Sequence, residues 1–367
     1  MNDKLLSAAG EPLVDVVIPI HDPSRPIQRT IDSLLQSGLR VPEELRINVV
    51  CHNIDVAEIS AAVSEAVRGS VRFLSFLDGE PSPAGPFSFG IEAATAEYVS
   101  IMGSDDFLEP GALRAWVEVA MRMGLTAFIP PERHSSGAKV ATPPVRPWRS
   151  GLLDPVRDRL AYRTAPLGLI KRSVITRLGL TMPSRLRNGS DQLFGLKLWF
   201  SGEHLAYGKG LPHYVVGADA TSRVTFTIRK AADELRAVDE ILSDPWVGSL
   251  PPHARRAIIV KSVRVHVFSA ALLRCSGDRW TQEDREFIRE LLGRALSLSP
   301  TYLRALSIAD RRLVDALTAA NRPLETLERL VNARRRYGHP ITVLTRDVRG
   351  LFMRDGPLRF MVASKLL

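Results

Sequence analysis

Two adjacent carboxylates, Asp105 and Asp106, follow closely on the apolar run from Tyr98 to Met102. An apolar run that stops at acidic residues is typical of a buried strand that ends at a functional site. Carboxylates at such a strand end can hold a hard divalent cation, which in turn can neutralise a diphosphate. The alternative is a turn with a helix cap, since aspartate also caps helices and Pro110 follows nearby.

The segments around this pair alternate between predicted strands and predicted helices. Strands are predicted at 14–20, 45–51, 71–77, 98–102 and 126–129, and a further strand running into a helix at 167–178. Helices are predicted from about 26 to 38 and at 55–67, 89–96 and 113–123. Strands that alternate with helices over short connections form a parallel sheet with right-handed crossovers, so the predicted fold class is α/β.

Polar residues stand at the carboxyl ends of four of these strands. They are His21-Asp22, His52-Asn53, Asp78-Gly79 and Asp105-Asp106. Because a ligand of a parallel α/β sheet lies beyond the carboxyl ends of its strands, this convergence indicates one site at that edge.

The pattern changes further along the chain. Residues 130–151, rich in Pro, Ser and Arg, are predicted to be a mobile surface loop or flap. From about Thr227 only helices are predicted, at 228–243, 253–274, 281–297, 301–319 and 323–336, with Thr281 opening one of them as a cap. We therefore expect a first domain at 1–227, with halves at about 13–110 and 111–227, and a helical domain at 228–367.

The composition is that of a globular protein. The hydrophobic share of 45% with 24% charged residues excludes an intrinsically disordered chain. Cys51 and Cys275 are the two cysteines, so no disulfide framework is expected and a reducing cytosol is favoured. The first twelve residues lack the pattern of a signal peptide, and no run approaches the roughly 20 apolar residues of a spanning helix.

Arginine carries most of the net charge of +9, with 41 of the 49 basic residues. Arginine suits bidentate contact with phosphate, which leaves nucleotide and lipid-phosphate partners open, although high-GC codon usage is an equally good explanation. The basic residues are not clustered with aromatic residues, so a nucleic-acid partner is not expected. Walker, nucleophile-elbow, HExxH and paired CxxC motifs do not occur.

Taken together, these segments resemble a family 2 glycosyltransferase of the GT-A nucleotide-diphospho-sugar-binding fold. The similar segments, in the family's order, are 14–20, 81–94, 96–106, 169–174 and 188–198, so the resemblance covers roughly residues 13–226. It implies a mostly parallel central sheet, here followed by an all-helical C-terminal domain. It also implies an inverting transfer, in which a base deprotonates an acceptor hydroxyl that attacks the anomeric carbon as the nucleotide diphosphate leaves.

The resemblance implies roles for particular residues. Asp191 is the candidate catalytic base, with an N-cap of the helix at 191–200 as the alternative. Asp106 is the first candidate ligand for Mn²⁺ or Mg²⁺, and His213 and Asp219 are later candidates. The candidate donor-binding residues lie at the strand ends: Pro19, His21, Asp22, His52, Asn53, Asp78, Ser104 and Asp105.

Three segments depart from the family's pattern. Gly103 stands where the family has the first acid of its metal motif. Cys51-His52-Asn53 replaces a paired aspartate at the end of the second strand, and Phe87-Ser88 replaces a basic residue and an asparagine. The candidates to compensate for the missing cation are Arg25, Lys171 and Arg223.

The predicted function is a hexosyltransferase (EC 2.4) of cell-envelope or glycoconjugate biosynthesis. The donor is a nucleotide sugar, with a UDP-sugar favoured, and the acceptor is a glycan, a lipid-linked molecule or a small molecule. The alternatives are a non-catalytic relative that serves as a binding or assembly subunit and, less favoured, a nucleotidyltransferase.

The C-terminal tail, residues 344–367, mixes arginines with leucine and phenylalanine. Packing against its own domain is favoured, over a peripheral contact with anionic lipid or a homo-oligomer surface. The expected location is cytoplasmic, at most peripheral at the inner face of the membrane.

Overall fold

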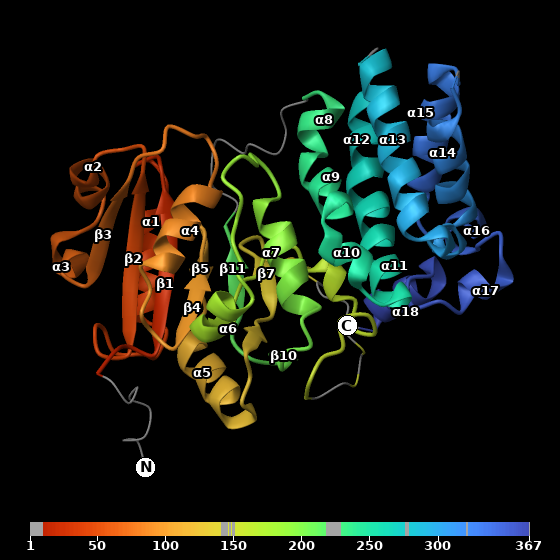
Figure 1. Cartoon of the computed structure of the whole chain (residues 1–367). Coiled ribbons are helices and arrows are strands. Elements are labelled where there is room, and N and C mark those ends of the chain that lie inside the picture. The colour runs from red at the N-terminus through yellow and green to blue at the C-terminus, as the bar shows by residue number, and fades with distance from the viewer. Residues whose placement is uncertain are drawn as a thin grey trace. The chain divides into compact units, whose positions relative to one another are not determined.

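The computed structural model in Figure 1 describes residues 10–140, 146, 148, 151–217, 229–275, 279–320 and 322–366. The chain divides into two compact units, each described by itself below. The first comprises Met1–Thr142, Ser150–Leu153 and Thr164–Arg223, and the second comprises Pro143–Arg149, Asp154–Arg163 and Val224–Leu367. Residues 154–163, which the sequence places in the first domain, thus lie in the helical unit, where the Tyr162 hydroxyl accepts a hydrogen bond from Arg264 at 2.8 Å.

A seven-stranded sheet forms the centre of the first unit, in the order β10-β6-β9-β4-β1-β2-β3. Its strands are β1 Val14–Ile20, β2 Leu45–His52, β3 Val71–Phe76, β4 Tyr98–Ile101, β6 Ala127–Ile129, β9 Leu169–Lys171 and β10 Leu205–Tyr207. The neighbours β4, β1, β2 and β3 are parallel, whereas β9 runs antiparallel to β4 and β6. The prediction of a mostly parallel sheet is confirmed, and four parallel strands end at one edge.

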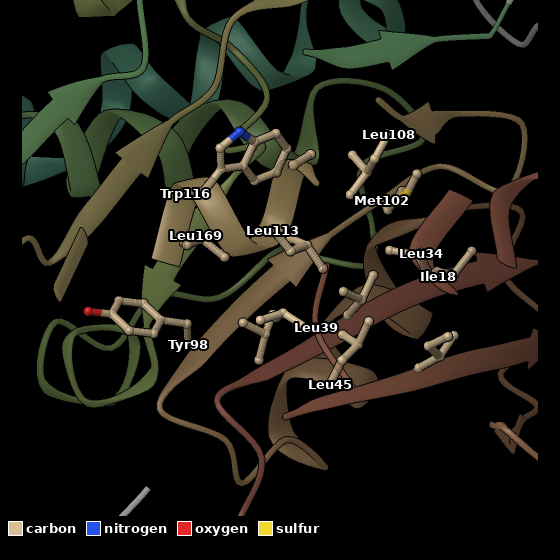
Figure 2. Close-up of a cluster of buried hydrophobic side chains, with 14 of the residues drawn as sticks. Ile18, Leu34, Leu39, Leu45, Tyr98, Met102, Leu108, Leu113, Trp116 and Leu169 are labelled. Atoms are coloured by element: carbon tan, nitrogen blue, oxygen red, sulfur yellow. The ribbon is translucent and has the colours of Figure 1, made fainter. Parts of the chain in front are cut away.

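Helices pack on both faces of these parallel strands. They are α1 Ile27–Leu35, α2 Val56–Ala61, α3 Glu65–Arg68, α4 Ala84–Glu92, α5 Ala112–Met123, α6 Arg172–Arg177 and α7 Ser190–Trp199. Alternate residues of β1 enter one core with the apolar sides of α1 and α5, and Figure 2 draws members of that core, among them Ile18, Leu34 and Trp116. Val17 faces the other way, towards α4.

Two helices differ from their predicted bounds. The helix expected at 55–67 is broken into α2 and α3. The helix expected at 89–96 begins earlier, at Ala84, because Pro86 lies in the first turn, where its missing N–H costs no hydrogen bond. The Pro- and Gly-rich composition of that turn resembles a loop, and for this reason the sequence places the start too late.

A second, four-stranded sheet has the order β5-β11-β7-β8. Its strands are β5 Phe107–Leu108, β7 Glu132–His134, β8 Lys139–Val140 and β11 Tyr214–Val216. The prediction of a mobile flap at 130–151 is therefore wrong for residues 130–140, since β7 pairs with β11 and with β8. The pairing with β11 joins residues about eighty positions apart, which a local pattern does not reveal.

The second unit is helical, as predicted. Its elements are η1 Leu160–Tyr162, α8 Ala231–Glu234, α9 Arg236–Ser243, α10 Pro245–Ser249, α11 Pro252–Lys261, the π-helix η3 Ser262–Val267, α12 Phe268–Arg274, α13 Gln282–Leu298, η4 Pro300–Ala305, α14 Ile308–Thr318, α15 Leu324–Arg334, α16 Pro340–Val343, α17 Val348–Leu351 and α18 Pro357–Lys365. Thr281 caps α13, as expected, by accepting a hydrogen bond from the backbone N–H of Asp284 at 3.1 Å. Across the described ranges, no helix is long and apolar enough to cross a membrane.

Candidate functional site

The order of the parallel strands creates a switch point between β1 and β4. The chain passes from β1 to β2 and β3 on one side and then returns to β4 on the other side of β1. Ligands of open α/β sheets bind in the crevice outside the carboxyl ends of the strands at such a point. The segment after β1 and the segment after β4, which carries Asp105 and Asp106, therefore flank the expected crevice.

The segment after β4 is held on one side by the beginning of α1. The Thr30 hydroxyl donates to the carbonyl of Asp106 at 2.7 Å, and Arg29 donates to the carbonyl of Asp105 at 2.6 Å. The guanidinium of Arg25 forms an ion pair with the Asp105 carboxylate, with 2.6 Å between Nη2 and Oδ1. Arg25 and Asp105 are both largely buried, so this pair ties the ends of β1 and β4 together.

Strand β11 holds the same segment on the other side. The Tyr214 hydroxyl donates to Oδ2 of Asp106 at 2.5 Å, and the backbone N–H of Gly217 donates to Oδ1 at 2.8 Å. A Cβ at Gly217 would lie 1.9 Å from the carbonyl oxygen of Asp105, and a Cβ at Gly103 would lie 2.6 Å from Oδ2 of Asp106. A side chain at position 103 would therefore collide with the Asp106 carboxylate, which gives a physical reason for the glycine there.

Asp105 and Asp106 differ in what their carboxylates can still bind. Burial raises the pKa of Asp106 above its usual value, and the charge of Asp105 adds to this, against the hydrogen bonds from Tyr214 and Gly217. Both oxygens of Asp106 already accept hydrogen bonds from the protein. Within the described residues Oδ2 of Asp105 has no such partner, so Asp105 is the carboxylate that can still accept a ligand.

The other candidate metal ligands do not join Asp106. His213 pairs with Glu109, with 2.9 Å between Nδ1 and Oε2, and Glu109 also binds Arg133 at 2.7 Å. Asp219 lies outside the described residues. In the ranges given above, no three His, Cys, Asp or Glu side chains are grouped to hold a metal ion. A cation at this edge would therefore need oxygens from its ligand as well as from Asp105.

Tyr214→Phe should lower the free energy of unfolding by about 1–3 kcal/mol. The change removes a hydroxyl that donates to Asp106 and accepts from the backbone N–H of Gly103 at 3.2 Å, leaving buried polar atoms unpaired. Urea unfolding measures the effect. Tyr98→Phe is the control, because that hydroxyl makes no hydrogen bond within the described residues. Equal losses in the two variants would contradict the bracing role of Tyr214.

A hydrogen-bonded cluster lies at the ends of β2 and β3. His52 Nε2 is 2.8 Å from Oδ1 of Asp78, and the amide of Asn53 donates to the same oxygen at 3.3 Å. The side-chain oxygen Oδ1 of Asn53 accepts hydrogen bonds from the backbone N–H groups of Asp78 and Gly79, at 3.1 and 3.0 Å. Burial would raise the pKa of Asp78, but its hydrogen bonds, chiefly from His52, hold it below the usual value. The Asp78 carboxylate is therefore a hydrogen-bond acceptor held in a fixed position.

The remaining predicted residues lie at the same edge with less defined roles. His21 is exposed and Pro19 is half-buried at the end of β1, whereas Ser104 is buried. Asp22 accepts a hydrogen bond from the backbone N–H of Ser24 at 2.8 Å and shapes the turn into α1. Of the compensating cations proposed from the sequence, only Arg25 is found at this edge. Lys171 pairs with Tyr98 at the opposite end of β4, and Arg223 lies outside the described residues.

Asp191 lies in the first turn of α7. The helix starts at Ser190 with Gly189 at its N-cap position, so the alternative that Asp191 is the cap residue is wrong. The chain leading to α7 passes beside the loop at the end of β3, because the Ser82 hydroxyl donates to the carbonyl of Leu186 at 2.6 Å. Trp199, at the other end of α7, is buried in the core. The fold therefore brings the start of α7 towards the edge where β3 ends.

Comparison with known proteins agrees with this architecture. The family model described as glycosyl transferase family 2 matches residues 15–179. These residues form a family 2 glycosyltransferase domain with the GT-A fold, so the family and the fold class predicted from the sequence are confirmed.

Two curated relatives carry glycosyltransferase names. Poly(ribitol-phosphate) beta-N-acetylglucosaminyltransferase TarP of Staphylococcus aureus is 22% identical over 221 residues, covering 59% of this chain and 67% of TarP. Poly(ribitol-phosphate) beta-glucosyltransferase of Bacillus spizizenii is 18% identical over 204 residues, covering 55% of this chain and 32% of that protein. These names agree with the family whose model matches residues 15–179.

The crystal structure of residues 1–349 of S. aureus TarS has a similar fold, with a TM-score of 0.67 at 15% identity over 88% of this chain and 91% of that one. The same TarS segment in complex with UDP-GlcNAc gives a TM-score of 0.67 at 14% identity, with the same coverage. At this level of identity the likeness establishes the fold.

Proposed function

We propose that the protein transfers a sugar from a nucleotide-diphosphate donor to a hydroxyl of an acceptor polymer, with inversion. The observation that carries this proposal is the convergence of polar side chains at the carboxyl edge of β4, β1, β2 and β3 in a family 2 domain. The Arg25–Asp105 pair lies at the switch point, and the His52–Asn53–Asp78 cluster lies two strands away. The Arg25–Asp105 pair suits the diphosphate of the donor, and the His52–Asn53–Asp78 cluster suits its nucleobase.

At the nucleobase end of the proposed donor site, the protein offers hydrogen-bond acceptors. The Asp78 carboxylate can only accept hydrogen bonds, so it favours a base that presents a ring N–H, as uracil does. His52, whose Nε2 contacts Asp78 and whose ring lies 5.9 Å from that of Phe76, is proposed to stack against or hydrogen-bond the nucleobase. The TarS segment has been solved with UDP and with UDP-GlcNAc, which supports a UDP-sugar as the donor of this chain.

At the end of the site where the sugar is transferred, the reaction needs a catalytic base for the acceptor hydroxyl and positive charge for the leaving diphosphate. Asp191, in the first turn of α7, is the proposed base that takes the proton of the acceptor hydroxyl. Arg25 supplies positive charge beside the position where negative charge grows as the bond to the donor oxygen breaks. A divalent cation, Mn²⁺ or Mg²⁺, fits the available oxygen of Asp105 together with phosphate oxygens, and when bound it neutralises the diphosphate. Asp106, braced by Tyr214 and Gly217, positions Asp105.

The acceptor proposal follows from the relatives. Both curated relatives are named for transfer to poly(ribitol phosphate), which supports an anionic cell-envelope polymer as the acceptor of this chain.

A nucleotide screen followed by a turnover assay tests the proposal. UDP and UDP-sugars, with Mn²⁺ or Mg²⁺, should raise the melting temperature more than the adenine and cytosine nucleotides do. UDP should then be released when a poly(ribitol phosphate) acceptor is added. Failure of every nucleotide diphosphate to bind, with or without cation, would refute the proposal. Binding without turnover on any acceptor would support the non-catalytic alternative.

A further inference from the structure

Arginines gather in the second unit where residues 154–163 meet the C-terminal helices. Arg159 is buried and donates to the carbonyl of Arg359 at 3.2 Å, with its guanidinium 5.7 Å from the ring centre of Phe360. Arg359 in turn donates to the carbonyl of Phe352 at 2.9 Å. Arg354 lies close enough to interact electrostatically with both, and Arg146 and Arg157 lie close enough to interact with Arg354. We call Arg146, Arg157, Arg159, Arg354 and Arg359 the arginine cluster.

The carboxylates near this cluster, Asp154, Asp158 and Asp355, are fewer than its five arginines. Asp158 is taken up by a bidentate ion pair with Arg146, with both N–O distances 2.7 Å. Asp355 pairs with Arg256, which lies outside the cluster, at 3.2 Å. The guanidinium groups of Arg157 and Arg354 make no hydrogen bond or ion pair with any residue that the structure describes. An excess of positive charge therefore remains.

The positive charges of these arginines repel one another. Burial, together with the charges of Arg359, Arg157 and Arg146, lowers the pKa of Arg354 below its ordinary value. Burial also lowers the pKa of Arg159, with the charges of Arg359 and Arg354 contributing. A bound anion would relieve this repulsion, because opposite charge favours the protonated guanidinium.

A cavity of about 470 Å³ extends from Phe360, the aromatic residue next to the arginine cluster. Its lining includes Arg264, Arg334 and Arg335 but only one carboxylate, Asp310, which Arg334 binds at 3.0 Å. Its volume is in the range that holds a small ligand such as a sugar or a polyol phosphate unit. The positive charge therefore continues from the arginine cluster into a concave surface.

We propose that the arginine cluster and the adjoining cavity bind the phosphodiester groups of the acceptor polymer. This rests on the proposed function for the identity of the polymer. Guanidinium groups match phosphate oxygens in geometry and charge, and a polymer with regularly spaced phosphates can occupy several at once. The burial of Arg159 and the adjoining cavity favour a polymer over a membrane, since neither presents a flat surface to lipid.

Binding of a synthetic poly(ribitol phosphate) oligomer to the full chain tests the proposal, by isothermal titration calorimetry. The test variant is Arg157→Gln/Arg354→Gln, which removes the two arginines without protein partners. The oligomer affinity should fall roughly ten-fold or more, since charged hydrogen bonds carry that much each. The affinity of the parent should also fall with rising ionic strength. UDP binding, measured with Mn²⁺ present, should be unchanged.

Arg322→Gln/Arg329→Gln is the matched control. It removes two exposed arginines of the same unit outside the cluster and should leave the oligomer affinity unchanged. Equal affinity of the test variant and the parent, or equal losses in test variant and control, would overturn the proposal. So would binding to phosphatidylglycerol vesicles with no binding to the oligomer. If the parent binds the oligomer but no nucleotide, the proposed function fails while the polymer site stands.

Discussion

Asp191→Asn should lower kcat by roughly 10²–10⁴-fold and leave the dissociation constant of the nucleotide sugar unchanged. Asparagine has the size of aspartate but cannot accept the proton of the acceptor hydroxyl. The residue lies in the first turn of α7 and is not its cap, so the helix does not depend on its charge for capping. Steady-state rates of UDP release with saturating acceptor, together with donor binding by calorimetry, measure both quantities.

The pH profile separates a catalytic base from a structural carboxylate. In the parent, kcat should fall on the acid side as the base becomes protonated, and the variant should lack that limb. Asp32→Asn is the control. Asp32 lies on α1 and accepts a hydrogen bond from Gln28 at 2.7 Å, which asparagine can also accept. An Asp191→Asn variant with full kcat would refute the assignment, and loss of donor binding together with activity would point to a structural role.

The sheet edge to which we assign this chemistry could be predicted because the sequence signals that mark it are local. Each parallel strand is a short apolar run followed at once by polar residues, as with Ile20 before His21 and Ile101 shortly before Asp105. Parallel order then places all these ends together without any knowledge of side-chain contacts. The sheet, the family and the position of α7 were accordingly predicted correctly.

The bonds that shape the site could not be predicted in the same way. The hydrogen bond between Tyr214 and Asp106 joins residues 108 positions apart, and the pair of Arg25 with Asp105 spans 80. Neither contact produces a periodicity in the sequence, because the partners lie on elements that only the tertiary fold brings together. The same reason explains why Asp106, the more conspicuous metal candidate, turns out to be enclosed by protein donors.

In the sequence alone, Gly103 is only the loss of the first acid of the metal motif. A Cβ at this position would lie 2.6 Å from the Asp106 carboxylate, so the missing acid is coupled to the inward position of Asp106. With Asp106 turned inward, Asp105 is the acid of the pair that keeps an oxygen for a ligand, and Arg25 is the cation beside it. Charge at the switch point is therefore supplied by one carboxylate and one guanidinium.

Arg25→Gln should lower kcat by roughly 10²–10³-fold, with a smaller effect on donor affinity. Negative charge on the diphosphate grows as the sugar leaves, so a cation at this point stabilises the transition state more than the bound donor. Nη2 of Arg25 contacts Oδ1 of Asp105 at 2.6 Å, and its Nε is buried without a hydrogen-bond partner in the described residues. Rates of UDP release and donor affinities, measured on the same preparations, give the two effects separately.

Two further variants show whether charge or packing is responsible. Arg25→Lys keeps the charge but not the planar guanidinium, and it should recover part of the lost kcat. Arg40→Gln is the control, because Arg40 pairs with Glu44 before the start of β2, at the opposite edge of the sheet, and should keep the parental rate. If Arg25→Gln retained the parental kcat, the diphosphate would draw its positive charge from elsewhere. If both Arg25 variants lost stability in equal measure, the ion pair would serve only to join β1 and β4.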